Sequence, residues 1–310
     1  MSKAVASLCS SSRAKLLEVW LGPGFEDNYA RYYDSGGWTD SAFVNYFAVT
    51  GDHPEFANTT EELIKSVHTF SSKPIVVVNF GHISPVIVSW TAKRFPQLVL
   101  LNAHRLDAPI SFNFNKFRAM MLANVRTGVQ LDSDQFVYRG ADVLFDSTER
   151  EVTKDYPYPI LPVHWLARDP EGKDGYEGYE GYDAFRCQTE AGDGHAHPTW
   201  TYYALPFLGK LLSTELDDPR HVLDTSIHVQ EDEDALNVGL WSVGATKQWC
   251  NFDVPYPDIF EDFAKQNGQS LLGCCQYKDS KWYPQGVPLL FVTAHAAKDP
   301  AQTRKILGFA

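Results

Sequence analysis

The sequence has no run of about 18 apolar residues, the length that a membrane-spanning helix needs. We therefore expect no membrane span and, by default, a soluble protein of the cytoplasm. Cysteine is scarce as well: the five cysteines are odd in number and lack the spacing of a disulfide framework or a metal site. Reduced thiols in a reducing compartment are the expected state.

Positive charge is in short supply. The chain has 27 Lys and Arg against 39 Asp and Glu, which gives a net charge of −12. Such a surface repels the phosphates of nucleic acids and of anionic membranes, so we expect no nucleic-acid partner. A phosphorylated substrate would have to be held by a metal ion or by a few well-placed Lys and Arg residues.

What the sequence does contain is an alternation of strand and helix patterns over residues 42–137. Strands are predicted at 44–50, 74–80, 98–102 and 129–131, and helices at 59–70, 85–94 and 115–125. The run 74–80 is apolar on both faces, which is typical of a strand buried in a parallel sheet. The predicted fold class is α/β, an open, mostly parallel, Rossmann-like sheet flanked by helices in a single domain.

The rest of the chain gives weaker structural signals. We expect a lead-in over residues 1–41, made of loops and a short helix at 14–21. Later elements are expected as a turn at 127–128, a turn at 141–146, a strand at 157–166, a helix at 200–213 and a strand at 287–293. Residues 171–198 begin with a Gly-Tyr-Glu repeat too polar to pack, and are predicted to form an exposed loop or lid.

Two carboxylates follow the strand predicted at 129–131. In an extended chain Asp132 and Asp134 would share one face, about 6–7 Å apart at ~3.3 Å per residue. Ligands bind at the carboxyl ends of parallel strands, which is where this pair would lie. Oxygen ligands suit Mg²⁺ or Mn²⁺, and such ions complete their coordination with substrate phosphates. The pair therefore favours a metal site over a solvated turn.

Other polar segments allow two interpretations each. The acids at 231–234 suit the start of a helix, which the helix dipole favours by about 0.3–1 kcal/mol, but four adjacent like charges exceed what a helix start needs and indicate a site. His195 and His197 could bind zinc, although a loop explains them better. Trp200, Tyr202 and Tyr203 are more typical of helix packing than of a carbohydrate platform.

Three separated segments resemble glycosyltransferases of the GT-A type, most closely the glycogenin-like group that includes bacterial lipopolysaccharide galactosyl- and glucosyltransferases. The first runs from residue 115 through Asp132-Ser133-Asp134 to the Asp-Val-Leu-Phe at 142–145. The second, at 232–237, is similar to the family's Asp-Gln-Asp-x-x-Asn. The third, at 295–298, is similar to its His-x-x-Gly-x-x-Lys with a shorter spacing. Together the likeness spans about residues 42–300.

The resemblance implies roles for particular residues. Asp132, Asp134 and His295 would bind Mn²⁺ or Mg²⁺. Contacts to a nucleotide-sugar donor would come from Val49, Thr50, Lys116, Arg118, Ser133 and Lys298. Catalytic carboxylates would be Asp232, Glu233 and Asp234. Glu233 stands where the retaining members carry Gln, and a carboxylate there could act as a nucleophile or as a base, so retention and inversion both stay open.

The sequence thus predicts a metal-dependent hexosyl- or pentosyltransferase, with its domain over residues 42–310. A nucleotide-diphosphate sugar, UDP-linked by preference, would donate to a hydroxyl of a glycan or another acceptor. One alternative is a sugar-phosphate nucleotidyltransferase, but residues 50–53 are not the Gly-rich phosphate loop that such an enzyme needs. The other is a catalytically silent carbohydrate-binding protein.

Overall fold

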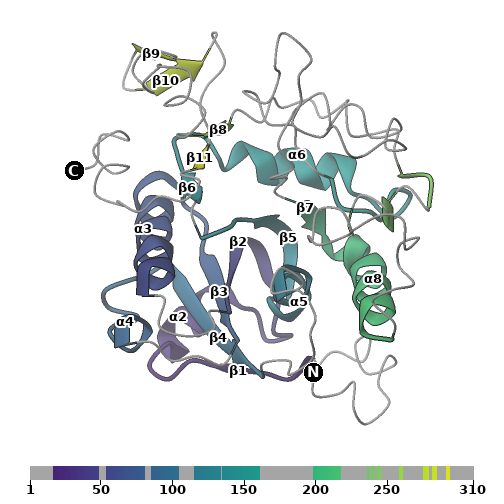
Figure 1. Cartoon of the computed structure of the whole chain (residues 1–310), viewed down its shortest axis with the longest axis horizontal. Coiled ribbons are helices and arrows are strands. Elements are labelled where there is room, and N and C mark those ends of the chain that lie inside the picture. The colour runs from purple at the N-terminus through teal and green to yellow at the C-terminus, as the bar shows by residue number, and fades with distance from the viewer. Residues whose placement is uncertain are drawn as a thin grey trace.

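The computed structural model describes residues 17–48, 54–80, 85–104, 115–133, 135–160 and 198–217, together with 236, 239–240, 243–245, 258–260, 275–278, 281–284 and 291–293. A six-stranded sheet in the order β1-β4-β3-β2-β5-β7 lies at its centre (Figure 1). Its strands are β1 (Val19–Leu21), β2 (Thr39–Phe47), β3 (Ile75–Asn79), β4 (Leu98–Ala103), β5 (Val125–Gln130) and β7 (Thr199–Thr201). The four inner strands are parallel and both edge strands are antiparallel, so the predicted fold class is confirmed.

Helices cover both faces of this sheet. They are α2 (Glu26–Tyr32), α3 (Pro54–Phe70), α4 (Pro85–Val88), α5 (Asn115–Leu122), α6 (Val143–Glu151) and α8 (Leu205–Asp217). Figure 1 shows α3 on one side of the strands and α5 with α8 on the other. Among the described residues, no helix combines the length and the apolar character needed to cross a bilayer.

Smaller elements complete the fold. The strands β6 (Gln135–Val137), β11 (Phe291–Thr293) and β8 (Asp258–Phe260) form a second sheet in the order β6-β11-β8. A hairpin pairs β9 (Cys275–Lys278) with β10 (Lys281–Pro284). A turn of 3-10 helix, η5 (Tyr202–Ala204), joins β7 to α8. The strand β6 links the two sheets along the chain, since it begins five residues after β5 ends.

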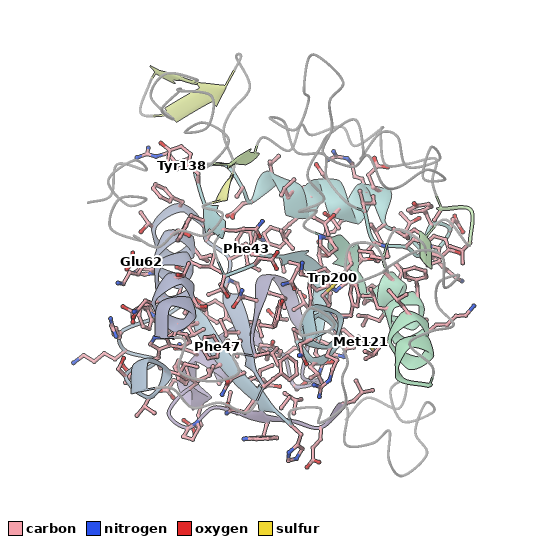
Figure 2. All side chains as sticks on the ribbon, viewed as in Figure 1. Phe43, Phe47, Glu62, Met121, Tyr138 and Trp200 are labelled. Carbon is pink, nitrogen blue, oxygen red and sulfur yellow. The ribbon has the colours of Figure 1, made fainter. Side chains whose placement is uncertain are left out.

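Side chains along the central strands point alternately to the two faces of the sheet, so the hydrophobic core consists of two layers. On β3, Val76 and Val78 pack into the cluster that contains α5 and α8, while Ile75 and Val77 pack into the cluster that contains α3. Successive strand residues point to opposite faces, so both sets must be apolar. Figure 2 shows the result: Glu62 on α3 and Met121 on α5 lie on opposite sides of the strands.

The segment expected as a loop-rich lead-in contributes to the sheet. Residues 19–21 form a strand that pairs with β4, so the helix predicted at 14–21 is wrong over these residues. The following helix α2 is anchored by Asn28, whose side-chain amide donates to the carbonyls of Phe95 at 2.9 Å and Leu98 at 2.7 Å. Tyr33 donates to the carbonyl of Ala123 at 2.6 Å. These buried polar contacts fix α2 and the segment that follows it against the central sheet.

Several helix boundaries differ from the prediction. The helix expected to begin at Thr59 or Thr60 begins at Pro54, a residue well suited to a first helical turn, and both threonines are buried inside α3. The helix predicted at 85–94 is only the single turn Pro85–Val88, because β-branched residues dominate it. The helix predicted to reach residue 125 ends at Leu122, where Asn124 (φ 48°) turns the chain into β5.

For three further elements the predicted type is wrong over all or part of their length. Residues 127–128 lie inside β5 instead of forming a turn. The turn predicted at 141–146 is confirmed only at residues 141–142, because helix α6 begins at Val143. The helix predicted at 200–213 is confirmed only from Leu205, after strand β7 and η5. Of the strand predicted at 157–166, only the part up to Ile160 is described, and there Ile160 forms an isolated bridge with Thr199.

The strand position of Gly128 depends on its neighbour Trp200. This indole is fully buried, and a Cβ atom added to Gly128 would lie 2.2 Å from its Cζ2. A side chain at residue 128 would therefore displace either β7 or the indole.

We predict that Gly128→Ala lowers the free energy of unfolding by about 3 kcal/mol, because the added methyl group overpacks this contact. Urea denaturation measures the change. Trp200→Phe removes the ring atoms that clash, so in the double variant part of the loss should be recovered. Strictly additive losses in the two variants would show that Gly128 matters for another reason.

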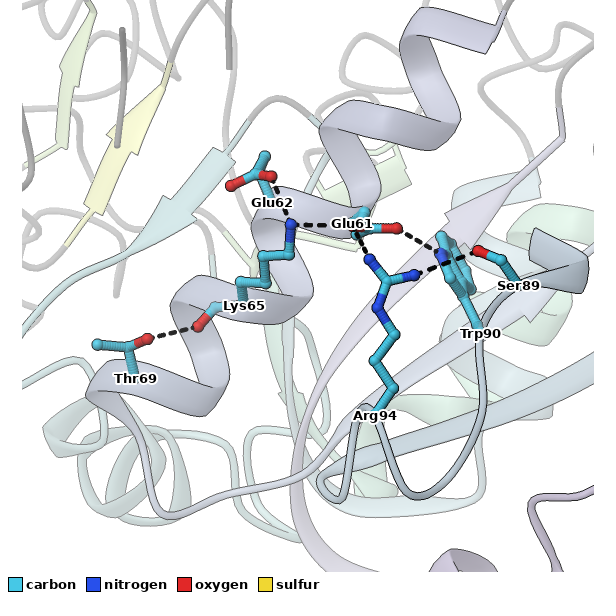
Figure 3. Close-up of polar contacts among 7 residues, drawn as sticks. All are labelled: Glu61, Glu62, Lys65, Thr69, Ser89, Trp90 and Arg94. Atoms are coloured by element: carbon cyan, nitrogen blue, oxygen red, sulfur yellow. Dashed lines mark hydrogen bonds and ion pairs between the residues drawn. The ribbon is translucent and has the colours of Figure 1, made fainter. Parts of the chain in front are cut away.

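A polar network fixes α3 to the segment after α4 (Figure 3). The Glu61 carboxylate pairs with Lys65 at 2.9 Å and with Arg94, and it accepts a hydrogen bond from the Trp90 indole at 3.2 Å. Partial burial raises the pKa of Glu61, but the hydrogen bond from Lys65 and the charges of Lys65 and Arg94 outweigh it and hold the pKa below its usual value.

Glu61→Gln should therefore cost about 1 kcal/mol of stability at pH 7. The lowered pKa in the folded state makes this contribution present above the unfolded-state pKa and lost as the pH falls through the folded-state value. The difference between wild type and variant, measured by urea denaturation from pH 7 to pH 3, should shrink toward acid. Glu26→Gln, at an exposed position of α2, is the matched control and should cost little. A constant difference at every pH would contradict the ionic origin of this stabilisation.

Candidate active site

Polar side chains gather at the carboxyl ends of the parallel strands. Asn79 ends β3 and donates from its amide to Asn102 near the end of β4 at 2.9 Å. Asn45 lies near the end of β2, and Gln130 ends β5. Asp132 follows two residues later. Parallel strands present their carboxyl ends along one edge, the usual place for ligand binding in an open α/β sheet.

Asp132 sits at the point where the chain leaves the sheet. The amide of Leu131 still donates to the carbonyl of Val44 at 2.9 Å. The carbonyl of Asp132 then accepts from the Gln135 amide at 3.1 Å, and the Asp132 amide donates to the Gln135 side chain at 2.6 Å. These bonds make a turn after Leu131, so Asp132 does not continue β5, and the spacing of Asp132 and Asp134 expected from an extended chain stays a prediction. Asp134 itself lies outside the described residues.

The carboxylate of Asp132 is paired with Lys116. The Lys116 ammonium lies 3.2 Å from Oδ1 and 3.2 Å from Oδ2 of Asp132. Lys116 comes from the first turn of α5 and its side chain is only 4% exposed, whereas that of Asp132 is 23% exposed. Among the described residues, none donates a well-aligned hydrogen bond to Oδ1, although this oxygen is buried. The site thus offers a partly solvent-facing carboxylate held by a buried cation.

Arg118 follows Lys116 by two residues on the same helix and has different contacts. Its guanidinium donates to the carbonyl of His104 at 2.8 Å and to the Asn115 side chain at 3.0 Å, and it lies over the Phe80 ring at 4.4 Å. Burial lowers the pKa of Arg118 to about 10, which still leaves it charged at neutral pH. Arg118 therefore holds together the segments that follow β3 and β4.

Two amide side chains that the sequence analysis did not single out support the turn. Asn45 and Gln130 both donate to the carbonyl of Leu131, at 2.9 Å and 3.0 Å, and Asn45 also lies 3.5 Å from the hydroxyl of Ser133. Within the described part of the chain their own amide oxygens accept no hydrogen bond. The sequence does contain a sign of this role. Asn45 lies inside the apolar run of residues 43–47 and Gln130 precedes Leu131, and an amide side chain in a buried strand needs a hydrogen-bond partner.

The structure thus brings Asp132, Ser133 and Lys116 together, with Arg118 turned toward the neighbouring strand ends. The remaining predicted site residues lie outside the described residues: Val49, Thr50, Asp134, His195, His197, Asp232, Glu233, Asp234, His295 and Lys298. Where the structure is described, no three His, Cys, Asp or Glu residues cluster as metal ligands. Asp132 fits a divalent cation as one oxygen ligand, because its side chain is 23% exposed and carboxylate oxygens are the ligands that Mg²⁺ and Mn²⁺ prefer.

No protein-family model matches this chain, and no curated protein matches it in sequence. Its structure is similar to several solved structures, two of which are of the glycosyltransferase GlyE. GlyE of Streptococcus pneumoniae TIGR4 is 15% identical with a TM-score of 0.37, and the match covers 64% of this chain and 43% of GlyE. The apo form of GlyE is 14% identical with a TM-score of 0.38, over 66% and 44%. An active-site mutant of LgtC is 12% identical with a TM-score of 0.47, over 87% and 95%.

The chain therefore spans less than half of the GlyE chains that it matches.

The pairing of Lys116 with Asp132 makes a thermodynamic prediction. Lys116→Met should cost about 2 kcal/mol of stability, because it leaves a half-buried carboxylate without its cation. In an Asp132→Asn background the same change should cost less, because no charge is left unpaired. A double-mutant cycle by urea denaturation measures this coupling, and a coupling energy of zero would show that the ion pair does not contribute.

Proposed function

We propose that this chain is a metal-dependent glycosyltransferase that moves a sugar from a nucleotide-diphosphate donor, UDP-linked by preference, to a hydroxyl of a glycan or another acceptor. The observation that carries the proposal is the Asp132 carboxylate at the end of β5, partly exposed and backed by the buried ammonium of Lys116. The three sequence segments that resemble GT-A enzymes supply the reaction class.

Asp132 would hold Mn²⁺ or Mg²⁺ through a carboxylate oxygen, together with Asp134 and His295. When bound, the cation would supply Lewis-acid stabilisation of the nucleoside diphosphate that leaves the sugar. Lys116 would place a second positive charge beside the phosphates, which a chain of net charge −12 needs. Ser133 would offer its hydroxyl to the donor from the same turn.

The Lys116 ammonium also limits how the metal binds. Because it already neutralises Asp132, a divalent cation gains little from this carboxylate alone. Phosphate oxygens from the donor would supply the missing ligands and charge, as is usual for Mg²⁺ sites. We therefore expect metal and nucleoside diphosphate to bind together, each raising the affinity for the other.

The remaining roles follow the sequence resemblance. Val49 and Thr50 would contact the nucleoside, and Lys298 and Arg118 would support the donor, Arg118 by fixing the segments after β3 and β4. Asp232, Glu233 and Asp234 are the proposed catalytic carboxylates. One of them would take the proton from the acceptor hydroxyl, or Glu233 would attack the anomeric carbon.

Thermal unfolding in the presence of nucleotides tests the proposal. We predict that UDP together with Mn²⁺ stabilises the protein by about 2.7 kcal/mol at a hundredfold excess over Kd, and that neither alone matches this effect. Asp132→Asn should abolish the joint effect, while Asp155→Asn, at an exposed position, should keep it. Stabilisation by UDP that is equal with and without metal would contradict the metal assignment.

The same panel separates the alternatives. An increase in thermal stability caused by a nucleoside triphosphate together with a sugar phosphate would favour a nucleotidyltransferase. Stabilisation by glycans, with none by any nucleotide, would identify a carbohydrate-binding protein and overturn the proposed transferase.

A further inference from the structure

A second group of polar and aromatic residues lies at the amino ends of β2 and β5, the edge of the sheet opposite Asp132. We call it the Tyr202 patch, and it consists of Asp34, Trp38, Asp40, Arg126, Tyr202 and Tyr203. Trp38 immediately precedes β2, and Arg126 is the second residue of β5. Because β7 runs antiparallel to β5 with Thr201 opposite Thr127, η5 begins beside the start of β5.

Arg126 is the centre of this patch. Its guanidinium lies 2.8 Å from Asp34 and 3.3 Å from Asp40, and 5.8 Å from the centre of the Trp38 ring. Asp34 is itself fixed, since it accepts hydrogen bonds from the amides of Gly36 at 2.8 Å and Trp38 at 3.0 Å. Hydrogen bonding to the Trp38 amide and to Arg126 lowers the pKa of Asp34, so this carboxylate stays ionised and can accept hydrogen bonds.

The two tyrosines form an aromatic surface next to Arg126. Their ring centres lie 4.1 Å apart with an angle of 33° between the ring planes, and Tyr202 is 41% exposed. The hydrogen bond with the Tyr203 side chain raises the pKa of Tyr202, while the nearby Arg126 acts in the opposite direction. The packing role expected for residues 200–203 thus holds for Trp200, which is fully buried, but not for Tyr202.

This patch is separate from the candidate active site. Residues 126 and 132 are six positions apart along β5 and its exit, a span of about 20 Å at ~3.3 Å per residue. Asp132 pairs with Lys116 and contacts Gln135, neither of which belongs to the patch.

The net charge and the aromatic rings of the Tyr202 patch favour one class of ligand. Two carboxylates against one guanidinium leave a net negative charge, which disfavours phosphorylated or acidic ligands. Exposed aromatic faces carry negative π charge that attracts the C–H groups of a sugar ring, and carboxylates with an Arg accept from and donate to its hydroxyls. We propose that the Tyr202 patch binds a neutral oligosaccharide, at a site distinct from the one that would carry out transfer.

Binding of defined oligosaccharides to the full chain tests this proposal. The probes are maltohexaose, cellohexaose and chitohexaose, titrated calorimetrically without nucleotide or metal. We predict that at least one of them binds and that Tyr202→Ala weakens its affinity about tenfold, as expected for loss of one stacked ring. Tyr202→Phe keeps the ring and should stay within about twofold of wild type.

Two control variants establish whether binding is specific to the Tyr202 patch. Trp20→Ala removes another aromatic side chain, 45% exposed on β1, and should leave binding unchanged. Asp132→Asn should also bind the oligosaccharide normally, whatever its effect on nucleotides, so failure of the transferase proposal would not affect this result.

Three results would overturn the patch as a glycan site. They are no binding of any probe, equal affinity in Tyr202→Ala and wild type, or loss of binding in Asp132→Asn. A change in oligomeric state in Tyr202→Ala, without a change in glycan affinity, would identify the patch as a contact between copies of this chain and would likewise overturn the proposal.

Discussion

The ion pair between Lys116 and Asp132 connects the fold of this protein to its proposed chemistry. It joins the first turn of α5 to Asp132, which lies two residues after the end of β5, at the carboxyl ends of the parallel strands. A lysine this deeply buried needs a carboxylate partner, and Asp132 in turn gains a fixed position. In the proposed function, the same charge arrangement would also hold the diphosphate and its metal ion.

The surrounding polar residues show how such an edge is built inside an apolar core. Asn45 and Gln130 occupy strand positions whose neighbours are fully buried, and both donate to the carbonyl of Leu131. Arg118 holds the segments after β3 and β4 together, because it lies over the Phe80 ring and donates to the carbonyl of His104. Buried polar groups are costly unless paired, so these side chains fix one geometry of the loops at this edge.

The sequence is a good guide to the sheet and a poorer guide to element ends. The apolar run of β3 and the helix patterns around it predict the parallel order, because burial on both faces leaves few alternatives. Gly128 resembles a turn residue in the sequence, since the reason for a glycine there is Trp200, 72 residues later in the chain. The strand β1 escapes prediction for a similar reason: only its pairing with β4 makes so short a segment extended.

The candidate site can be located from sequence in part. The pattern predicts Asp132 at a strand end and the resemblance names Lys116 as a donor contact, but no pattern shows that the two are paired. Electron paramagnetic resonance of Mn²⁺ tests the central claim most directly. We predict that the signal of free Mn²⁺ falls when the protein and UDP are both present, and that Asp132→Asn restores it. An equal loss of signal in both proteins would contradict the assignment of Asp132 as a metal ligand.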